Sequence, residues 1–195
     1  MSKLSKCLKI GVTVAAMATL SACVSITEVS GPYKAGKVVY NLDTSWNDMT
    51  GVSMQPKGVH LLTLDGVTLN RLYLSEGLAE GQHLARPNSN REKNTPSWRK
   101  DMGITEQMEF VSDSVEAYGY GRVEATSPRP VTVSGQRGVR FELSAKTEAG
   151  LDIKGIAQVV SKDDLAYVAI FIAPGEHYYP ANQASAVAAM DGLVL

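Results

Sequence analysis

Apolar and polar residues alternate strictly in the C-terminal half of this chain. Apolar side chains recur at Val139, Phe141 and Leu143 with charged or polar residues between them, and similar segments cover residues 131–133 and 151–159. A period of two indicates β-strands that have one buried face and one face toward water. Glycines separate these segments, so consecutive antiparallel strands joined by short turns are predicted.

Two neighbouring segments have different patterns. Residues 167–173 are apolar throughout, which predicts a central strand covered on both faces, and the Ala-rich residues 182–191 predict a closing helix. Earlier in the chain, residues 59–64 and 69–74 are joined through Asp65-Gly66. This arrangement predicts a hairpin, because Gly accepts the positive φ that such turns require.

The remaining elements are less regular. Residues 38–42 predict a strand followed by a turn that carries Trp46, and the polar residues 86–100 predict a long exposed loop. Thr95-Pro96 suits a helix start, and a second start follows at Thr105. From there an apolar stripe with a spacing of three and four residues predicts a helix that ends near Gly119 and lies across the sheet.

These elements predict one α+β domain over residues 38–195, in which helices pack on an antiparallel sheet of about six strands. Residues 23–37 contain Gly and Pro and show neither period, so a flexible tether is predicted there. Composition supports this organisation, since a hydrophobic fraction of 44% excludes wholesale disorder.

The first 22 residues have a different character from the rest. Three lysines precede an uncharged run of eleven residues, Ile10–Leu20, as in a bacterial secretory signal peptide. This run is too short to cross a bilayer, which takes about 20 residues. Without residues 1–22 the chain has 16 basic and 20 acidic residues, a formal charge of −4, so a strongly basic nucleic-acid binder is excluded.

The run ends in Leu20-Ser21-Ala22-Cys23, which resembles the lipobox of bacterial lipoproteins. The resemblance implies cleavage between Ala22 and Cys23 and attachment of lipid, palmitate included, to Cys23. Because Val24 and not Asp follows, we expect the periplasmic leaflet of the outer membrane. The alternative is an ordinary signal peptide with an incidental cysteine. Cys7 lies in the removed segment, so the mature protein is expected to contain neither a disulfide nor a free thiol.

The C-terminal half resembles a second family. It is similar to the Mog1/PsbP-like domain in three features. These are two strands within residues 138–158, a long apolar strand that ends in Ala173-Pro174, and a last helix after Tyr178-Tyr179. That resemblance implies an antiparallel sheet flanked by helices. The family includes small exported or lipid-anchored proteins and implies no single activity.

The sequence matches known catalytic motifs only weakly. Ser97 and Lys100 have the Ser-x-x-Lys spacing of penicillin-binding enzymes, but Ser112-Asp113-Ser114 and Lys146-Thr147-Glu148 match the companion motifs only in part. Solvated positions are the favoured interpretation of these residues. No metal-binding or nucleotide-binding motif occurs, and no cofactor is predicted.

Three kinds of residue remain as candidates for a site. Glu176 and His177 are the only acid–histidine neighbours and are a candidate ligand site or general base, against the alternative of a surface turn; the other histidines are His60 and His83. The basic side chains of the 86–100 loop are candidates for contact with anionic lipid. Several tyrosines could line a pocket, although core packing with the hydroxyls at the rim is the favoured interpretation: Tyr118, Tyr120, Tyr167, Tyr178 and Tyr179.

The sequence therefore favours a lipid-anchored protein of the bacterial cell envelope that faces the periplasm. We expect it to be a non-enzymatic module that binds an envelope protein or a small ligand. The alternatives are an envelope hydrolase with a site near Glu176 and His177, and a purely structural lipoprotein. Its partner or substrate and its oligomeric state are not specified by any motif.

Overall fold

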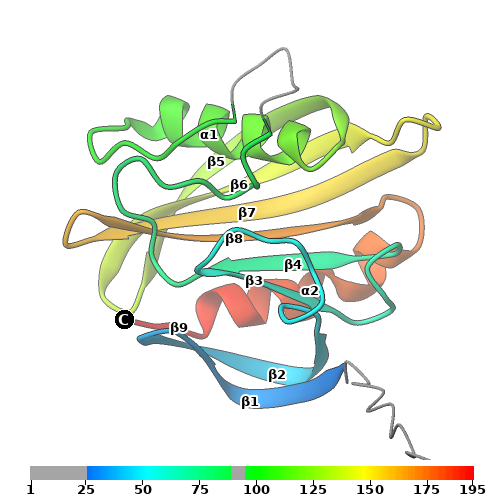
Figure 1. Cartoon of the computed structure of the whole chain (residues 1–195), viewed down its shortest axis with the longest axis horizontal. Coiled ribbons are helices and arrows are strands. Elements are labelled where there is room, and N and C mark those ends of the chain that lie inside the picture. The colour runs from blue at the N-terminus through cyan, green and yellow to red at the C-terminus, as the bar shows by residue number, and fades with distance from the viewer. Residues whose placement is uncertain (1–25, 89–94) are drawn as a thin grey trace, which may run out of the picture.

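The computed structural model describes residues 26–88 and 95–195. Nine strands form one antiparallel sheet in the order β1-β2-β3-β4-β8-β7-β6-β5, and β9 pairs with β2 (Figure 1). The strands are β1 Thr27–Ala35, β2 Val38–Asp48, β3 Val59–Thr63, β4 Arg71–Ser75, β5 Gly121–Val133, β6 Gln136–Lys146, β7 Asp152–Lys162, β8 Leu165–Pro174 and β9 Leu193–Val194; the helices are α1 Ile104–Ala117 and α2 Tyr178–Asp191.

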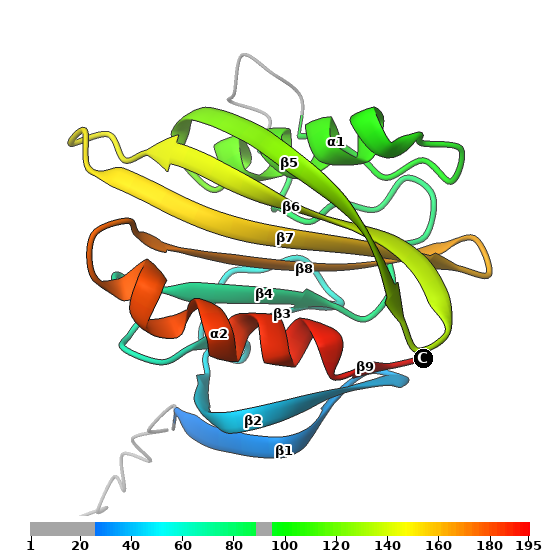
Figure 2. The same cartoon turned by 180° about the vertical axis from the view of Figure 1, so that it is seen from behind.

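The two helices cover opposite faces of the sheet. In Figure 1 α2 lies behind the sheet, and in Figure 2 it lies in front of it, along the middle strands. Helix α1 packs on β5 and β6, whereas α2 packs on β2, β7 and β8. This arrangement confirms the predicted α+β class, although the sheet contains more than the six strands expected.

Strand β8 is the central strand that its apolar sequence predicts. It pairs with β4 on one side and β7 on the other, so both of its edges are hydrogen-bonded within the sheet. Ala169 and Phe171 pack into the core under α2, while Ile170 and Ile172 pack into the core under α1. Because successive residues of a strand point to opposite faces, an apolar residue is needed at every position.

Strand β1 lies where a flexible tether was predicted. Tyr33 and Ala35 are buried, and the strand pairs with β2 along most of its length. Gly31, with a φ of +65°, lies at a shift in register that breaks the alternation and hides the strand in the sequence. The prediction of a tether through residue 37 is therefore wrong for residues 27–35.

Strand β2 is also longer than predicted. It continues to Asp48, so Trp46 is a fully buried strand residue and does not lie in a turn. Val38, Tyr40 and Leu42 set a two-residue period that places Trp46 on the same buried face. The ring of Trp46 makes an edge contact with Phe171 at 6.3 Å between centroids.

Helix α1 begins later than the first predicted start, and Thr95-Pro96 is not helical. The reason is Trp98, which is 1% exposed and packs edge-on against Phe110 of α1. Backbone hydrogen bonds of Trp98 with Gly81 and Gln82 hold it in place. The part of the predicted exposed loop around Trp98 is thus packed into the core, while Arg99 and Lys100 beyond it are exposed.

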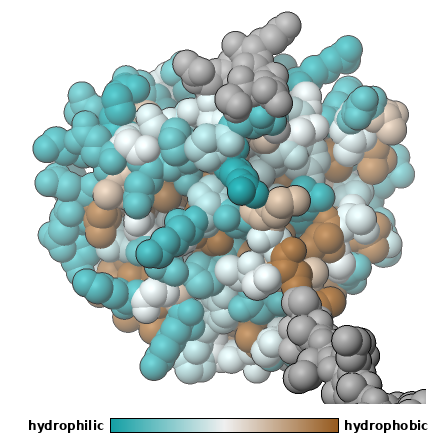
Figure 3. Space-filling model, viewed as in Figure 1, coloured by the Kyte–Doolittle hydropathy of each residue, from teal (hydrophilic) through white to brown (hydrophobic). Residues whose placement is uncertain are grey.

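The face of the molecule drawn in Figure 3 is mostly polar. In the view of Figure 3, hydrophobic residues form several separate groups among hydrophilic ones. In residues 26–88 and 95–195, neither helix has the length and hydrophobicity needed to cross a bilayer.

Candidate ligand-binding site around Arg71

Four side chains from three segments meet near one end of the sheet. Arg71 and Tyr73 stand two residues apart on β4, which places them on the same face. Tyr118 closes the C-terminal end of α1, and Tyr120 precedes β5. We call these four residues the Arg71 cluster.

Stacking and hydrogen bonds fix the geometry of the Arg71 cluster. The rings of Tyr73 and Tyr118 stack at 4.2 Å between centroids with an interplanar angle of 8°. The Tyr118 hydroxyl donates to the carbonyl oxygen of Leu84 at 2.6 Å. The guanidinium carbon of Arg71 lies 5.9 Å from the centre of the Tyr120 ring, within the range of a cation–π contact.

Most of the hydrogen-bonding capacity of Arg71 is unused. Its Nε donates to the carbonyl oxygen of Val67 at 2.6 Å, and Nη1 lies 3.4 Å from the Tyr73 hydroxyl. A guanidinium has five N–H donors. In the part of the chain that the structure describes, the other three N–H groups of Arg71 have no partner, and no carboxylate pairs with it.

The surroundings keep the cluster cationic. Burial opposes the charge of Arg71, but the neighbouring tyrosines outweigh it and hold the pKa of Arg71 above its ordinary value. Burial raises the pKa of Tyr73 to about 12 and also raises the pKa of Tyr118 and Tyr120. At neutral pH the site therefore carries one positive charge and neutral phenols.

Three members of the cluster, Arg71, Tyr118 and Tyr120, line a surface hollow with a volume of about 270 Å³, while Tyr73 lies buried behind them. Its wall combines apolar residues, among them Leu69, Leu151, Ile172 and Pro174, with the polar residues Thr68, Asn70 and Thr147, and among its described lining residues Arg71 is the only charged one. Small-molecule sites have about 300–1,000 Å³ and combine an apolar wall with a few polar groups. The hollow has this mixed character, and its volume lies just below that range.

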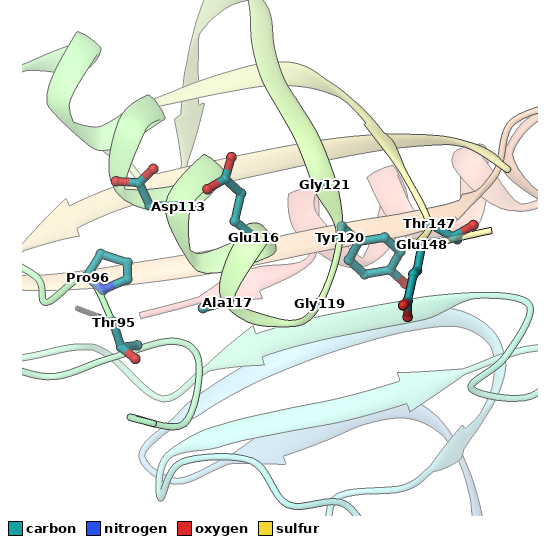
Figure 4. A pocket seen from close by; sticks show the side chains of 10 residues that line it. All are labelled: Thr95, Pro96, Asp113, Glu116, Ala117, Gly119, Tyr120, Gly121, Thr147 and Glu148. Carbon is teal, nitrogen blue, oxygen red and sulfur yellow. The ribbon is translucent and has the colours of Figure 1, made fainter. Parts of the chain in front are cut away.

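A second hollow of about 450 Å³ adjoins the first and shares Gly119, Tyr120 and Thr147 with it. Figure 4 shows Thr95 and Pro96 on one side of this second hollow and Thr147 and Glu148 on the other, with Asp113 and Glu116 on α1. Carboxylates thus line the second hollow, while an arginine lines the first, so the two have opposite charge.

The structure places the predicted pair Glu176 and His177 elsewhere. Both residues are exposed in the turn before α2, and the His177 ring touches only the edge of Tyr178, at 5.0 Å between centroids. Neither residue lines either of the two hollows. Among the described side chains none forms a hydrogen bond with them that would complete an acid–base pair.

The other histidine and serine candidates do not line the Arg71 hollow either. His60 is hydrogen-bonded to Tyr33 and Glu76, and His83 to the carbonyl oxygen of Pro96. Ser97 is not on a helix, while Ser112 and Ser114 bond back to carbonyls of α1. Among the described residues, no group of three histidine, cysteine or carboxylate side chains is arranged to hold a metal ion.

Some candidates lie outside the described residues. These are the predicted lipid attachment site Cys23 with the rest of the lipobox, and the loop cations Arg91 and Lys93.

The sequence pointed to two members of the cluster only as a less favoured alternative. Tyr118 and Tyr120 line the hollow, although core packing was the favoured interpretation, whereas Tyr167, Tyr178 and Tyr179 do not line it. Arg71 was missed because it belongs to no motif. The available signal was its position inside the apolar run 69–74, where a charged residue needs a partner or a ligand.

Comparison with known proteins gives the fold. No protein-family model and no curated protein matches the chain. Among solved structures, the cyanobacterial PsbP protein (CyanoP) of Synechocystis is similar, with 14% identity, 98% of each chain covered and a TM-score of 0.50. This likeness supports the resemblance to Mog1/PsbP-like domains at the level of fold.

Two other solved structures are also similar. The Ran-binding protein Mog1p of Saccharomyces cerevisiae has 12% identity over 86% of this chain and 89% of its own, with a TM-score of 0.48. A Pseudomonas aeruginosa protein of unknown function, described as a putative regulator, has 12% identity over 80% and 94%, with a TM-score of 0.43.

Proposed function

We propose that this protein is a non-enzymatic binding module of the bacterial cell envelope, held on the periplasmic side of the outer membrane by lipid on Cys23. Its ligand is a small molecule that binds in the hollow of the Arg71 cluster. The observation that carries the proposal is the guanidinium of Arg71, which has three unused N–H donors in a hollow that also presents apolar side chains. Such a group is stabilised when a ligand accepts these hydrogen bonds.

Binding fits this hollow better than catalysis does. General acid–base catalysis needs a group with a pKa near the working pH. The described lining residues of the Arg71 hollow include no histidine, cysteine or carboxylate. The pKa of Tyr73 is about 12, so its phenol stays protonated at neutral pH. The hollow can therefore hold and orient a ligand, but it offers no ready proton acceptor or nucleophile.

The alternative function, an envelope hydrolase that uses Glu176 and His177, has less support. Both side chains are exposed and lie outside the two adjoining hollows. Hydrolysis requires an acid, a base or a nucleophile to converge on one bond in a sheltered site.

The lipid anchor would hold the domain close to the membrane. Only residues 24–26 separate Cys23 from the start of β1 at Thr27. Four residues span at most about 14 Å when fully extended. The sheet edge formed by β1 would then face the lipid surface, with α1 on the far side of the sheet (Figure 1).

Replacement of the lipidated residue tests the anchor. The full chain carrying Cys23→Ser is expressed in a Gram-negative bacterium, and its processing and membrane fractionation are compared with those of the unchanged chain. We expect an unprocessed or soluble species without labelled palmitate. A variant that is cleaved and membrane-bound like the wild type would refute the anchor.

A retention experiment tests the binding role. The small-molecule fraction of a bacterial envelope is passed over the immobilised full chain, and retained compounds are identified by mass spectrometry. We expect compounds that are retained unchanged by the wild type and by Arg137→Gln, an exposed control at the other end of β6, but lost with Arg71→Gln. Equal retention by all three proteins, or conversion of the compounds, would contradict a binding role at Arg71.

A further inference from the structure

We propose that the Arg71 cluster recognises a small monocarboxylate whose carboxylate pairs with the Arg71 guanidinium and whose aromatic or branched body packs on the apolar wall. This inference deepens the proposed function and rests on it. It specifies the ligand by charge, size and shape.

The donor pattern of Arg71 selects a planar, singly charged acceptor. Arg71 uses Nε and one hydrogen of Nη1 within the protein, so one N–H of Nη1 and both N–H groups of Nη2 are available. A carboxylate accepts such donors through its two oxygens. The contacts of Nε with Val67 and of Nη1 with Tyr73 restrict the guanidinium before the ligand arrives, which lowers the entropy lost on binding.

The wall of the hollow selects an apolar body. Leu69, Ile172 and Pro174 line it, and Leu151, which is 50% exposed, is among the large hydrophobic side chains that the fold leaves in water. Covering such surface contributes about 25 cal/mol for each Å² removed from water. The ring of Tyr120, already near the Arg71 guanidinium, offers an aromatic ligand an edge or a face to pack against.

The adjoining hollow disfavours a second negative charge. Asp113 and Glu148 line it, and it adjoins the Arg71 hollow at the shared lining residues Gly119, Tyr120 and Thr147. Like charges in neighbouring sites repel, so a dicarboxylate that extends past Tyr120 meets these acids. Inorganic phosphate is disfavoured because the lining offers a single cation and phosphate has no apolar body to cover the apolar part of the wall.

A titration of the ¹⁵N-labelled full chain in detergent tests the proposal, with sodium phenylacetate as the probe. Its neutral analogue phenylacetamide keeps the aromatic body and removes the charge, whereas succinate and inorganic phosphate keep charge without the body. We expect phenylacetate to shift the Nε–H signal of Arg71 and to bind at least 10-fold more tightly than the other three compounds.

Variants assign this binding to Arg71. Arg71→Gln should weaken phenylacetate at least 10-fold, and Arg71→Lys, which keeps the charge but loses the planar fork, should fall between this variant and the wild type. Arg137→Gln should bind as the wild type does, because Arg137 is exposed and lies roughly 30 Å along β6 from Thr147. If Arg71→Gln does not fold, the wild-type comparison of phenylacetate with phenylacetamide decides.

Several outcomes overturn the inference: no binding of phenylacetate, equal binding of phenylacetamide, tighter binding of succinate or phosphate, or unchanged affinity in Arg71→Gln. If none of the probes binds but retention of envelope compounds still depends on Arg71, only the monocarboxylate assignment fails. If that retention is also independent of Arg71, the proposed function fails with it.

Discussion

The Nε2 atom of His60 lies 2.8 Å from Oε1 of Glu76, and the other ring nitrogen of His60 lies 2.7 Å from the hydroxyl of Tyr33. The Tyr33 hydroxyl in turn donates to Asp48 at 2.9 Å. Tyr33 belongs to β1 and His60 to β3, two strands that are not neighbours in the sheet. These hydrogen bonds therefore connect the edge strand β1 to β3 across β2.

Removing the His60 side chain should weaken this connection between β1 and β3. His60→Ala removes two partly buried hydrogen bonds, one of them to a carboxylate, and should lower the free energy of unfolding by about 1–3 kcal/mol. Urea denaturation of both proteins measures the difference. The control His177→Ala changes an exposed residue and should stay within about 0.5 kcal/mol of the wild type. Equal stability of the two variants would show that the His60 contacts contribute nothing.

Gln158 should be sensitive to loss of its amide. Its side chain is 1% exposed, donates to the carbonyl oxygen of Met190 in α2 at 2.9 Å, and accepts from Arg140. Gln158→Leu leaves both partners without this bond, so a loss of about 2 kcal/mol is expected in thermal or urea unfolding. Ser161→Ala, an exposed change on the same strand, is the control. A Leu variant as stable as this control would contradict the role given to the amide.

Gly155 marks a close approach between β7 and β8. A Cβ atom added at Gly155 would lie 2.7 Å from the carbonyl oxygen of Phe171, closer than van der Waals contact allows. Gly155→Ala should therefore destabilise the fold by about 1–3 kcal/mol, measured by urea denaturation. At Gly51 an added Cβ meets nothing within 4 Å, so Gly51→Ala should change stability little. A neutral Gly155→Ala would mean that the two strands are not so closely spaced.

Alkaline pH should weaken the fold through buried tyrosines. The pKa of Tyr73 is raised from 10.0 to about 12 by burial, so the folded state holds its proton more tightly than the unfolded chain does. That contribution is present in full below pH 10 and is lost as the pH rises toward 12, with a magnitude of about 2–3 kcal/mol. Unfolding free energies measured from pH 8 to 12 should fall less steeply in Tyr73→Phe. If the unfolding free energies of the wild type and Tyr73→Phe fell equally steeply with pH, the raised pKa of Tyr73 would be contradicted.

Regular segments of the fold could be predicted from the sequence, and irregular ones could not. Strand β8 can be recognised in the sequence because burial on both faces requires an apolar residue at every position. Strand β1 does not, because Gly31 and a register shift interrupt the alternation and its buried residues contact partners that are distant in sequence. Likewise, the contact of Trp98 with Phe110 is a tertiary contact that leaves no local pattern, so the sequence of residues 95–98 is typical of a loop.

The same distinction holds for the site. Aromatic residues near Gly119 are a local signal, and the sequence offered pocket lining for them only as the less favoured alternative to core packing. Arg71 is part of a site only because Tyr118 and Tyr120 lie beside it. These two residues are far along the chain and meet β4 through the packing of α1 and the start of β5. Glu176 and His177 are adjacent in sequence, but the turn that holds them directs both into solvent.

The most direct test of the lipid-anchored binding role is the native mass spectrum of the full chain released from bacterial membranes in mild detergent. The account predicts a mature chain that begins at Cys23, carries acyl groups, and holds a small ligand that is absent from Arg71→Gln but present in Arg137→Gln. A chain that lacks acyl groups, or a ligand retained equally by Arg71→Gln, would contradict it.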